Sequence, residues 1–473
     1  MRNDRLKKSQ VALRVIMFLI WTPLSGQTAR AQIAPIVEKI MQRQEQMQTG
    51  SERAPDATTL SLEQAIQLAI ENNLNTKLAD ERRSEALGRK LQALAALMPD
   101  VSAKASQSNN TVNIAAQGLR PGLLPIGSSF IGPFDSFDAR FQLAQTIFSL
   151  SSIRRFQSAR ADVDIAASEI KLAREQVASM AALAYLETLR AQRGVETAQA
   201  NLELAHSLLT LARNQKNAGV ATGVDVTRAE TRVAEQQVRL AQAETSEQTA
   251  MLQLLRVTGL PLGGAPLLID SLTGAGQPAP DIEQALQSAA QDRVEIEIAS
   301  QQVRRLDYEY KAARAALYPT IDFVAAYGSS GTRMNTISLP TRSVGVQVNI
   351  PIFNGGATWG KIKSARSREV QAELRLKDTR DQVEQDVRQT IQTLTAAIEQ
   401  ARAAEQEVLL AERELQQSRD RFAAGVGDNI EVLNAQTSLA NAQDAQIAAL
   451  TAYNAARINL AAAMGAAERF RWQ

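Results

Sequence analysis

The chain has 473 residues, of which 45% are apolar and 22% charged, and its formal net charge at pH 7 is +2. It contains no cysteine, which excludes thiol nucleophiles, disulfides and thiolate metal sites, and a single histidine, His206, which excludes His-paired triads and multi-histidine metal sites. Aromatic residues make up only 4%, and the chain is rich in the helix formers Ala, Gln, Glu, Arg and Leu. We therefore expect no catalytic residues, no metal and no cofactor.

Residues 1–31 have the layout of a secretory signal peptide. Basic residues precede the apolar run VIMFLIWTPL at 15–24, which is too short to span a membrane, and Ala-Arg-Ala at 29–31 provides a cleavage site. Removing this segment takes away six basic residues and one acid, so the mature charge becomes −3, which argues against a nucleic-acid partner. Residues 32–59 are polar and are expected to form a flexible lead-in.

The remaining chain contains an internal duplication. LEQA at 62–65 returns as IEQA at 282–285, and ALMPDV at 96–101 returns as ALYPTI at 316–321. GVATGVDVTRAETRVA at 219–234 matches GVGDNIEVLNAQTSLA at 425–440, with shared glycines that make chance similarity of helices unlikely. We expect a first repeat at 60–261, a linker at 262–280, a second repeat at 281–465 and a C-terminal tail at 466–473.

Long helices are predicted in each repeat. Neither Pro nor a cap signal interrupts 152–217 or 357–424, and about 65 helical residues would extend for roughly 100 Å. A heptad seam is expected at 163–184, on Val163, Ala166, Ile170, Ala173, Val177, Met180 and Ala184. In the second repeat the corresponding seam is Val387, Ile391, Leu394, Ile398 and Ala401. Such rods cannot form the interior of a compact domain.

Between the rods the apolar residues alternate with a period of two. This pattern predicts strands at about 100–117, 136–149, 320–332 and 342–353, and residues 118–135 read as a loop insertion of the first repeat. Each strand has the length of a tilted membrane strand, although a soluble hairpin with one packed face is the alternative. Four strands cannot close a barrel, so two or three copies would have to share one of eight or twelve strands.

The combination resembles the outer membrane efflux protein family, the TolC-like channels. The most specific stretches are LSLEQAIQLAIENN at 60–73, NIPIFNGG at 349–356 and AGVGDNIEVLNAQTSLANAQ at 424–443. The resemblance implies an α+β fold of mostly long helices, in which a homotrimer forms an α-helical periplasmic tunnel and a shared twelve-stranded transmembrane barrel in outer membrane lipid. It also implies passive export, with a periplasmic adaptor protein and an inner-membrane transporter as partners, and a linker that contributes to a belt around the tunnel.

Functional residues are expected at the two helix-to-helix turns, 217–223 and 423–429. The resemblance places adaptor-contacting tips there, at Ala218, Gly219, Val220, Ala424, Gly425 and Val426. An ordinary glycine-terminated hairpin is the simpler interpretation of the same residues.

The resemblance also implies carboxylates at a pore constriction just beyond the second tip. Here Glu431 supplies the first acid, Asn434 stands where the second is expected, and Asp225 is the equivalent in the first repeat. A ring of Glu431 would favour cations, although a first-turn acid also stabilises a helix N-terminus without any such role. Phe422 occupies the position of a gate aromatic, but Gly427 and Asp428 supply no basic partner for it.

Two other classes of protein are alternatives to an export channel. A soluble periplasmic coiled-coil adaptor or scaffold would carry one helical hairpin, whereas this chain repeats its hairpin and places the strands at the opposite end. A secreted enzyme would depend on carboxylates alone for acid–base chemistry. No ATP-binding loop is present, so energy for export would come from a partner.

Overall fold

The computed structural model describes residues 59–117, 130–272, 274, 276, 278–333 and 338–472. The predicted signal peptide at 1–31 and all of the lead-in except residue 59 lie outside the described residues. None of the described helices has both the length and the apolar character that crossing a membrane requires.

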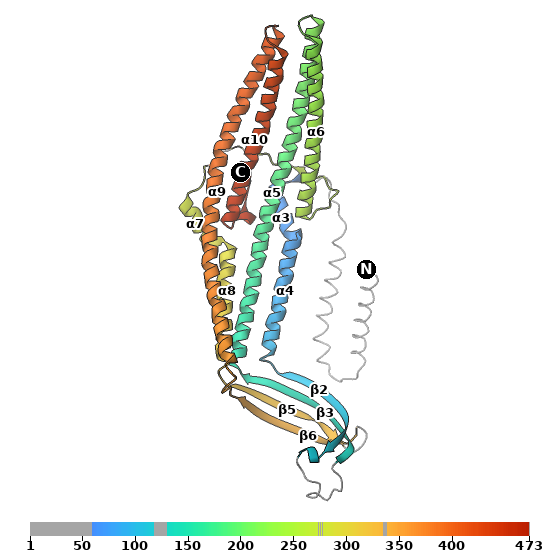
Figure 1. Ribbon diagram of the computed structural model, residues 1–473, viewed down its shortest axis with the longest axis vertical. Coiled ribbons are helices and arrows are strands. Elements are labelled where there is room, and N and C mark those ends of the chain that lie inside the picture. Colours follow the sequence, from blue (N-terminus) through green and yellow to red (C-terminus); the bar gives the residue numbers. More distant parts are fainter. Residues whose placement is uncertain are drawn as a thin grey trace, which may run out of the picture. The chain divides into compact units, whose positions relative to one another are not determined.

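The duplication is confirmed by the order and length of the elements (Figure 1). Helices α3 and α7 both have 11 residues, α4 and α8 both have 22, α5 and α9 have 68 and 67, and α6 and α10 have 36 and 35. The first repeat contains α3 (Leu62–Asn72), α4 (Leu74–Ala95), β2 (Asp100–Asn113), β3 (Phe130–Phe148), α5 (Leu150–Asn217) and α6 (Gly223–Thr258). The second contains α7 (Ile282–Asp292), α8 (Val294–Ala315), β5 (Thr320–Gly331), β6 (Ser338–Asn349), α9 (Ala357–Ala423) and α10 (Asn429–Ala463).

The strands of both repeats form one open antiparallel sheet in the order β2-β3-β5-β6. Strand β2 is shorter than predicted, because the Asn113 side chain accepts the N–H groups of Ala115 and Ala116 and starts a 3₁₀ turn at Ala115–Gln117. Strand β3 begins at Phe130, so residues 130–135 of the expected loop belong to the sheet. The alternation did not reveal this extension because a bulge in β3 between Ile131 and Phe134, opposite Asn110 and Val112 of β2, breaks it.

The last strand also differs from the prediction, since β6 begins at Ser338 and ends at Asn349, whereas 342–353 was expected. Pro351 follows closely and has no N–H to donate to a continued ladder.

The register gives this sheet one apolar face and one polar face. On the apolar face Leu143, Ala325 and Val344 are aligned across three strands, and Phe141 and Tyr327 form the next aligned pair. These side chains are not covered within the chain: Val344 is 73% exposed and Phe141 is 65% exposed. The opposite face carries Gln142, Arg140, Asp138 and their neighbours. An exposed apolar sheet face of this kind is typical of an interaction surface.

The helices pack on one another through small and β-branched side chains. The predicted seam of α9 is confirmed, since Val387, Ile391, Leu394, Ile398 and Ala401 are all buried. The seam of α5 is only partly correct, because Met180 is 44% exposed whereas Val177, Ala178 and Ala181 are fully buried. Helix α5 contacts α4, α6, α8 and α10, so its buried surface is not a single stripe.

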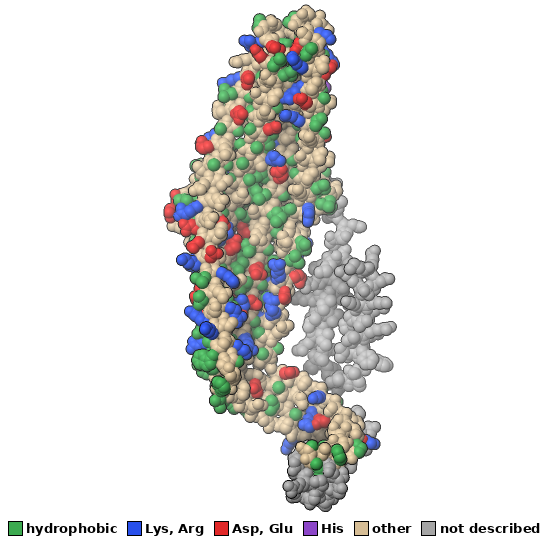
Figure 2. Space-filling model, viewed as in Figure 1, with side chains coloured by type: hydrophobic (Ala, Val, Ile, Leu, Met, Phe, Trp, Pro, Cys, Tyr) green, Lys and Arg blue, Asp and Glu red, His purple; other side chains and the backbone are tan. Residues whose placement is uncertain are grey.

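The linker and the C-terminal segment join the two repeats near the middle of the long helices. Within the linker, β4 (Leu267–Leu268) pairs in parallel with β1 (Thr59–Leu60). The C-terminal segment contains a 3₁₀ turn at Ala467–Arg469, and the indole N–H of Trp472 donates to the Ser271 carbonyl at 2.9 Å. Acidic and basic side chains are interspersed over the helices on the face in view in Figure 2.

Candidate functional site at the hairpin tips

Both long hairpins turn in the same way. Helix α5 ends at Asn217, Gly219 adopts φ +77°, and the N–H groups of Val220 and Ala221 donate to the Gln215 carbonyl. In the second repeat Gly425 adopts φ +74°, and two N–H groups beyond it donate to the Arg421 carbonyl at 3.0 and 3.1 Å. A left-handed residue after the C-cap satisfies the last helix carbonyls and favours glycine.

The structure brings the two tips together. The Gln215 side-chain amide donates to the Ala423 carbonyl at 3.2 Å, and that of Asn429 donates to the Asp225 carbonyl at 3.1 Å. A Cβ added to Gly425 would lie 3.5 Å from Cγ1 of Val220. The six tip residues named in the sequence analysis are all exposed, and Val426 is 72% exposed. The tips therefore form one small, apolar, solvent-facing surface.

Asp225 caps helix α6 rather than standing free. Its carboxylate accepts the Thr222 hydroxyl at 2.6 Å and the Thr222 N–H at 2.9 Å, while its own N–H donates to the Thr222 hydroxyl at 3.3 Å. These hydrogen bonds, and the Arg228 guanidinium 3.6 Å away, hold the pKa of Asp225 below its ordinary value of 3.8. Asp225 is therefore ionised at neutral pH and fixed in position.

Glu431 forms an ion pair that the sequence analysis missed. The Arg421 guanidinium lies 3.3 Å from the Glu431 carboxylate, and both side chains are about half exposed. Arg421 is the last basic residue before the turn, five residues before Val426, and Glu431 lies five residues after it. In an antiparallel hairpin, residues that are equally far from the turn lie opposite each other, so this equal spacing would have predicted the ion pair.

The other two predicted residues differ in burial. Phe422 is only 6% exposed and packs with Leu415, Val432 and Leu439 in the core beneath the tip. Asn434 is exposed, three residues beyond Glu431 on the same helix. The role of Phe422 as a gate aromatic stays a prediction, and its position indicates that it would act by holding the tip together.

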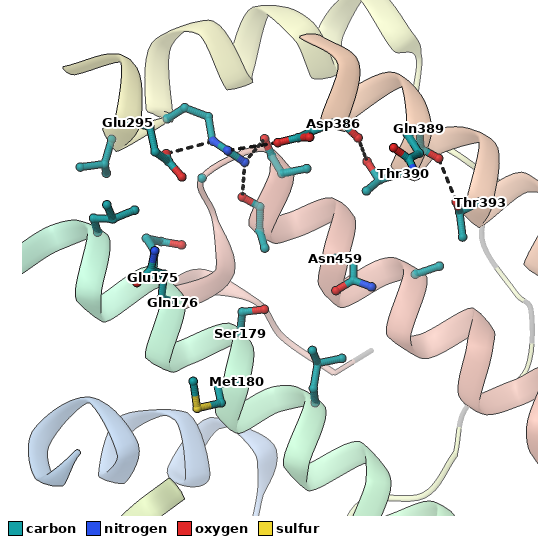
Figure 3. A pocket seen from close by; sticks show the side chains of 18 residues that line it. Glu175, Gln176, Ser179, Met180, Glu295, Asp386, Gln389, Thr390, Thr393 and Asn459 are labelled. Carbon is teal, nitrogen blue, oxygen red and sulfur yellow. Dashed lines mark hydrogen bonds and ion pairs between the residues drawn. The ribbon is translucent and has the colours of Figure 1, made fainter. Parts of the chain in front are cut away.

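A second concave region lies between α5, α8, α9 and α10 and has a volume of about 720 Å³ (Figure 3). Arg293 is 13% exposed there and forms ion pairs with Glu295 at 3.0 Å and Asp386 at 3.4 Å. Burial raises the pKa of Glu175, although its carboxylate accepts the Ala467 N–H at 2.7 Å. In the described part of the chain no group of three or more acidic or histidine side chains could hold a metal ion.

Known proteins resemble this chain in sequence and in fold. The chain matches the family of outer membrane efflux proteins over residues 65–260 and 285–466, one stretch in each repeat. It is 25% identical over 401 residues to the alkaline protease secretion protein AprF of Pseudomonas aeruginosa, covering 82% of this chain and 81% of that protein. It is 24% identical over 346 residues to the outer membrane protein TolC of Escherichia coli, covering 69% of each.

A solved structure shares the fold. The CmeC outer membrane channel of Campylobacter jejuni superimposes with a TM-score of 0.75 at 16% identity, covering 88% of this chain and 90% of that one. Because the family match spans most of both repeats, the chain belongs to the outer membrane efflux protein family, whose members are export channels of the outer membrane.

Proposed function

We propose that three copies of this chain form a passive export duct, with a shared twelve-stranded barrel in the outer membrane and a helical tunnel in the periplasm. The observation that carries the proposal is the open sheet, whose apolar face is exposed and whose outer strands, β2 and β6, each have one edge that no described residue pairs with. Strand directions alternate across β2-β3-β5-β6, so β6 of one copy and β2 of the next would again be antiparallel. Joining copies head to tail removes every edge, as lipid requires.

Three copies fit an export function better than two. An eight-stranded barrel is filled by its own side chains, whereas twelve strands leave room for a lumen. The polar sheet face would line that lumen, and the apolar face would contact outer membrane lipid.

The tips support docking of a periplasmic adaptor protein, which would couple the duct to an inner-membrane transporter. Small residues at both tips allow close approach of another helical hairpin, and no phosphate-binding loop in the sequence would let this chain supply energy itself. The cargo would be small molecules or proteins, since one relative is named for protease secretion and another, from Pseudomonas putida, for toluene efflux. The linker at 262–280 would contribute to a belt around the tunnel.

The tunnel would be narrowest near the tips, at a constriction lined by Glu431, Asn434 and Asp225. Glu431 and Arg421 lie together, so each copy would present a paired rather than a free carboxylate.

We expect Glu431→Gln to lower the cation selectivity of single channels, because three negative charges are lost from the narrowest part. Arg421→Gln is the matched variant and should raise the cation selectivity, because it removes the positive charge beside Glu431. Equal cation selectivity in both variants and in the wild type would show that Glu431 does not line the constriction.

The mass of the protein tests the proposal most directly. We expect material extracted from outer membranes in mild detergent to contain three chains after correction for bound detergent. A soluble monomer or dimer, recovered without detergent, would contradict the shared barrel and favour the periplasmic adaptor or scaffold as the alternative.

A further inference from the structure

The polar face of the sheet carries two cations directly opposite each other. Lys104 of β2 is aligned with Arg140 of β3, and the same row continues through Gly328 and Thr341. Like charges directly opposite each other in an antiparallel pair destabilise it. This pair is therefore unfavourable for the pairing of β2 with β3.

Among the described residues, only one of the two cations forms an ion pair. Arg140 Nε donates to Asp138 Oδ1 at 2.6 Å, and the Ser330 hydroxyl also contacts this carboxylate, at 3.4 Å. Lys104 is exposed, and among the described residues no carboxylate lies within 4 Å of its ammonium group. The row therefore has a net charge of about +1 in each chain.

Gly328 makes room for this arrangement. A Cβ on Gly328 would lie 2.0 Å from the Ala139 carbonyl oxygen, 2.5 Å from Cα of Arg140 and 2.8 Å from its Cγ, so the close β3 backbone and the start of the arginine side chain leave no room for another side chain here. Beyond Asp138, the nearest acids on the same face are Asp100 and Asp322, which lie four and six residues along their strands from this row, or roughly 13 and 20 Å away. Because the Debye length is about 8 Å at physiological salt, those acids do not cancel the positive charge locally.

We propose that Lys104 and Arg140 form a cationic band inside the duct that attracts the anionic groups of passing solutes. The inference rests on the proposed trimer, in which three copies would place three such pairs around one lumen. Charges that line a lumen tune its selectivity, and this band has the opposite sign to the carboxylates at the tips.

The absence of cysteine in the chain allows a sharp test. We would place Lys104→Cys in planar bilayers and measure the permeability ratio of potassium to chloride before and after labelling with two methanethiosulfonates, one carrying trimethylammonium and one carrying sulfonate. The substitution alone should raise the ratio about twofold, the cationic label should restore it, and the anionic label should raise it further.

Arg342→Cys is the matched control, because Arg342 lies in the adjacent row but on the apolar face, aligned with Tyr327. Its labelling should leave the ratio unchanged. Complete labelling of Lys104→Cys, verified by mass, without a change in selectivity would overturn the band, as would an effect at Arg342 alone. A wild type that forms no channel would instead overturn the proposed function, and this inference with it.

Discussion

Replacing Gly425 with tryptophan is expected to abolish export while the trimer still assembles. The glycine lies on the exposed tip surface with φ +74°, beside Val220 of the neighbouring hairpin. A large side chain would stand where an adaptor hairpin has to approach, and it would lie far from the sheet that joins the copies. Accumulation of ethidium and secretion of protein into the medium would be compared with wild-type and deletion strains.

Gly425→Ala separates bulk from backbone strain. Both variants force a residue with a Cβ into the left-handed region, at a cost of about 1–2 kcal/mol. The alanine Cβ would meet Val220 at an ordinary contact distance of 3.5 Å, so export should largely survive. Full export with tryptophan would exclude docking at this tip, whereas loss in both variants would indicate that strain alone disables it.

Replacing Arg293 with methionine is expected to destabilise the middle of the second repeat by about 2–3 kcal/mol. The guanidinium donates to the carbonyls of Ala462 and Ala463 at 3.3 Å each, in addition to its ion pairs with Glu295 and Asp386. Without it, two carboxylates and the end of α10 lose their partner. Both carboxylates are about one-third exposed, so we expect a smaller loss than the roughly 3–5 kcal/mol that breaking a fully buried pair costs.

Hydrogen exchange of the detergent-solubilised protein would measure this effect at the junction of α7 and α8 and in the last turn of α10. Arg388→Met is the control, since Arg388 on α9 forms an exposed pair with Glu384 at 2.8 Å and should cost no more than about 0.5 kcal/mol. Equal exchange rates in the two variants would show that Arg293 does not stabilise the junction of α7 and α8 or the end of α10.

Arg293 also shows where the two repeats diverge. In the first repeat its counterpart is Asn73, whose side-chain amide donates to the Val257 carbonyl at 3.1 Å. The junction between the two short helices thus binds the end of the last long helix in both repeats. A neutral side chain makes this contact in the first repeat, and a charged side chain with two ion pairs makes it in the second. The duplication could be predicted from the sequence. The shared contact could not, because its two residues are 184 positions apart in one repeat and 170 in the other, and only the tertiary structure brings them together.

The sequence by itself determined the features that depend on neighbouring residues. Periodicity identified the long helices and the four strand regions, and glycine at 219 and 425 identified the turns, because backbone conformation there depends on local side-chain spacing and on φ. The resemblance carried by residues 60–73, 349–356 and 424–443 was then sufficient to identify the family.

Only the tertiary structure decided which residues meet. The Arg421–Glu431 pair, the burial of Phe422 and the alignment of Lys104 with Arg140 all depend on the register between elements. A shift of one residue in a strand would move every side chain to the other face, and a shift along a hairpin would separate the charges at its tip. Local sequence patterns predict where helices and strands lie. The register between them depends on the packing of segments that are distant in the sequence, so no local pattern predicts it.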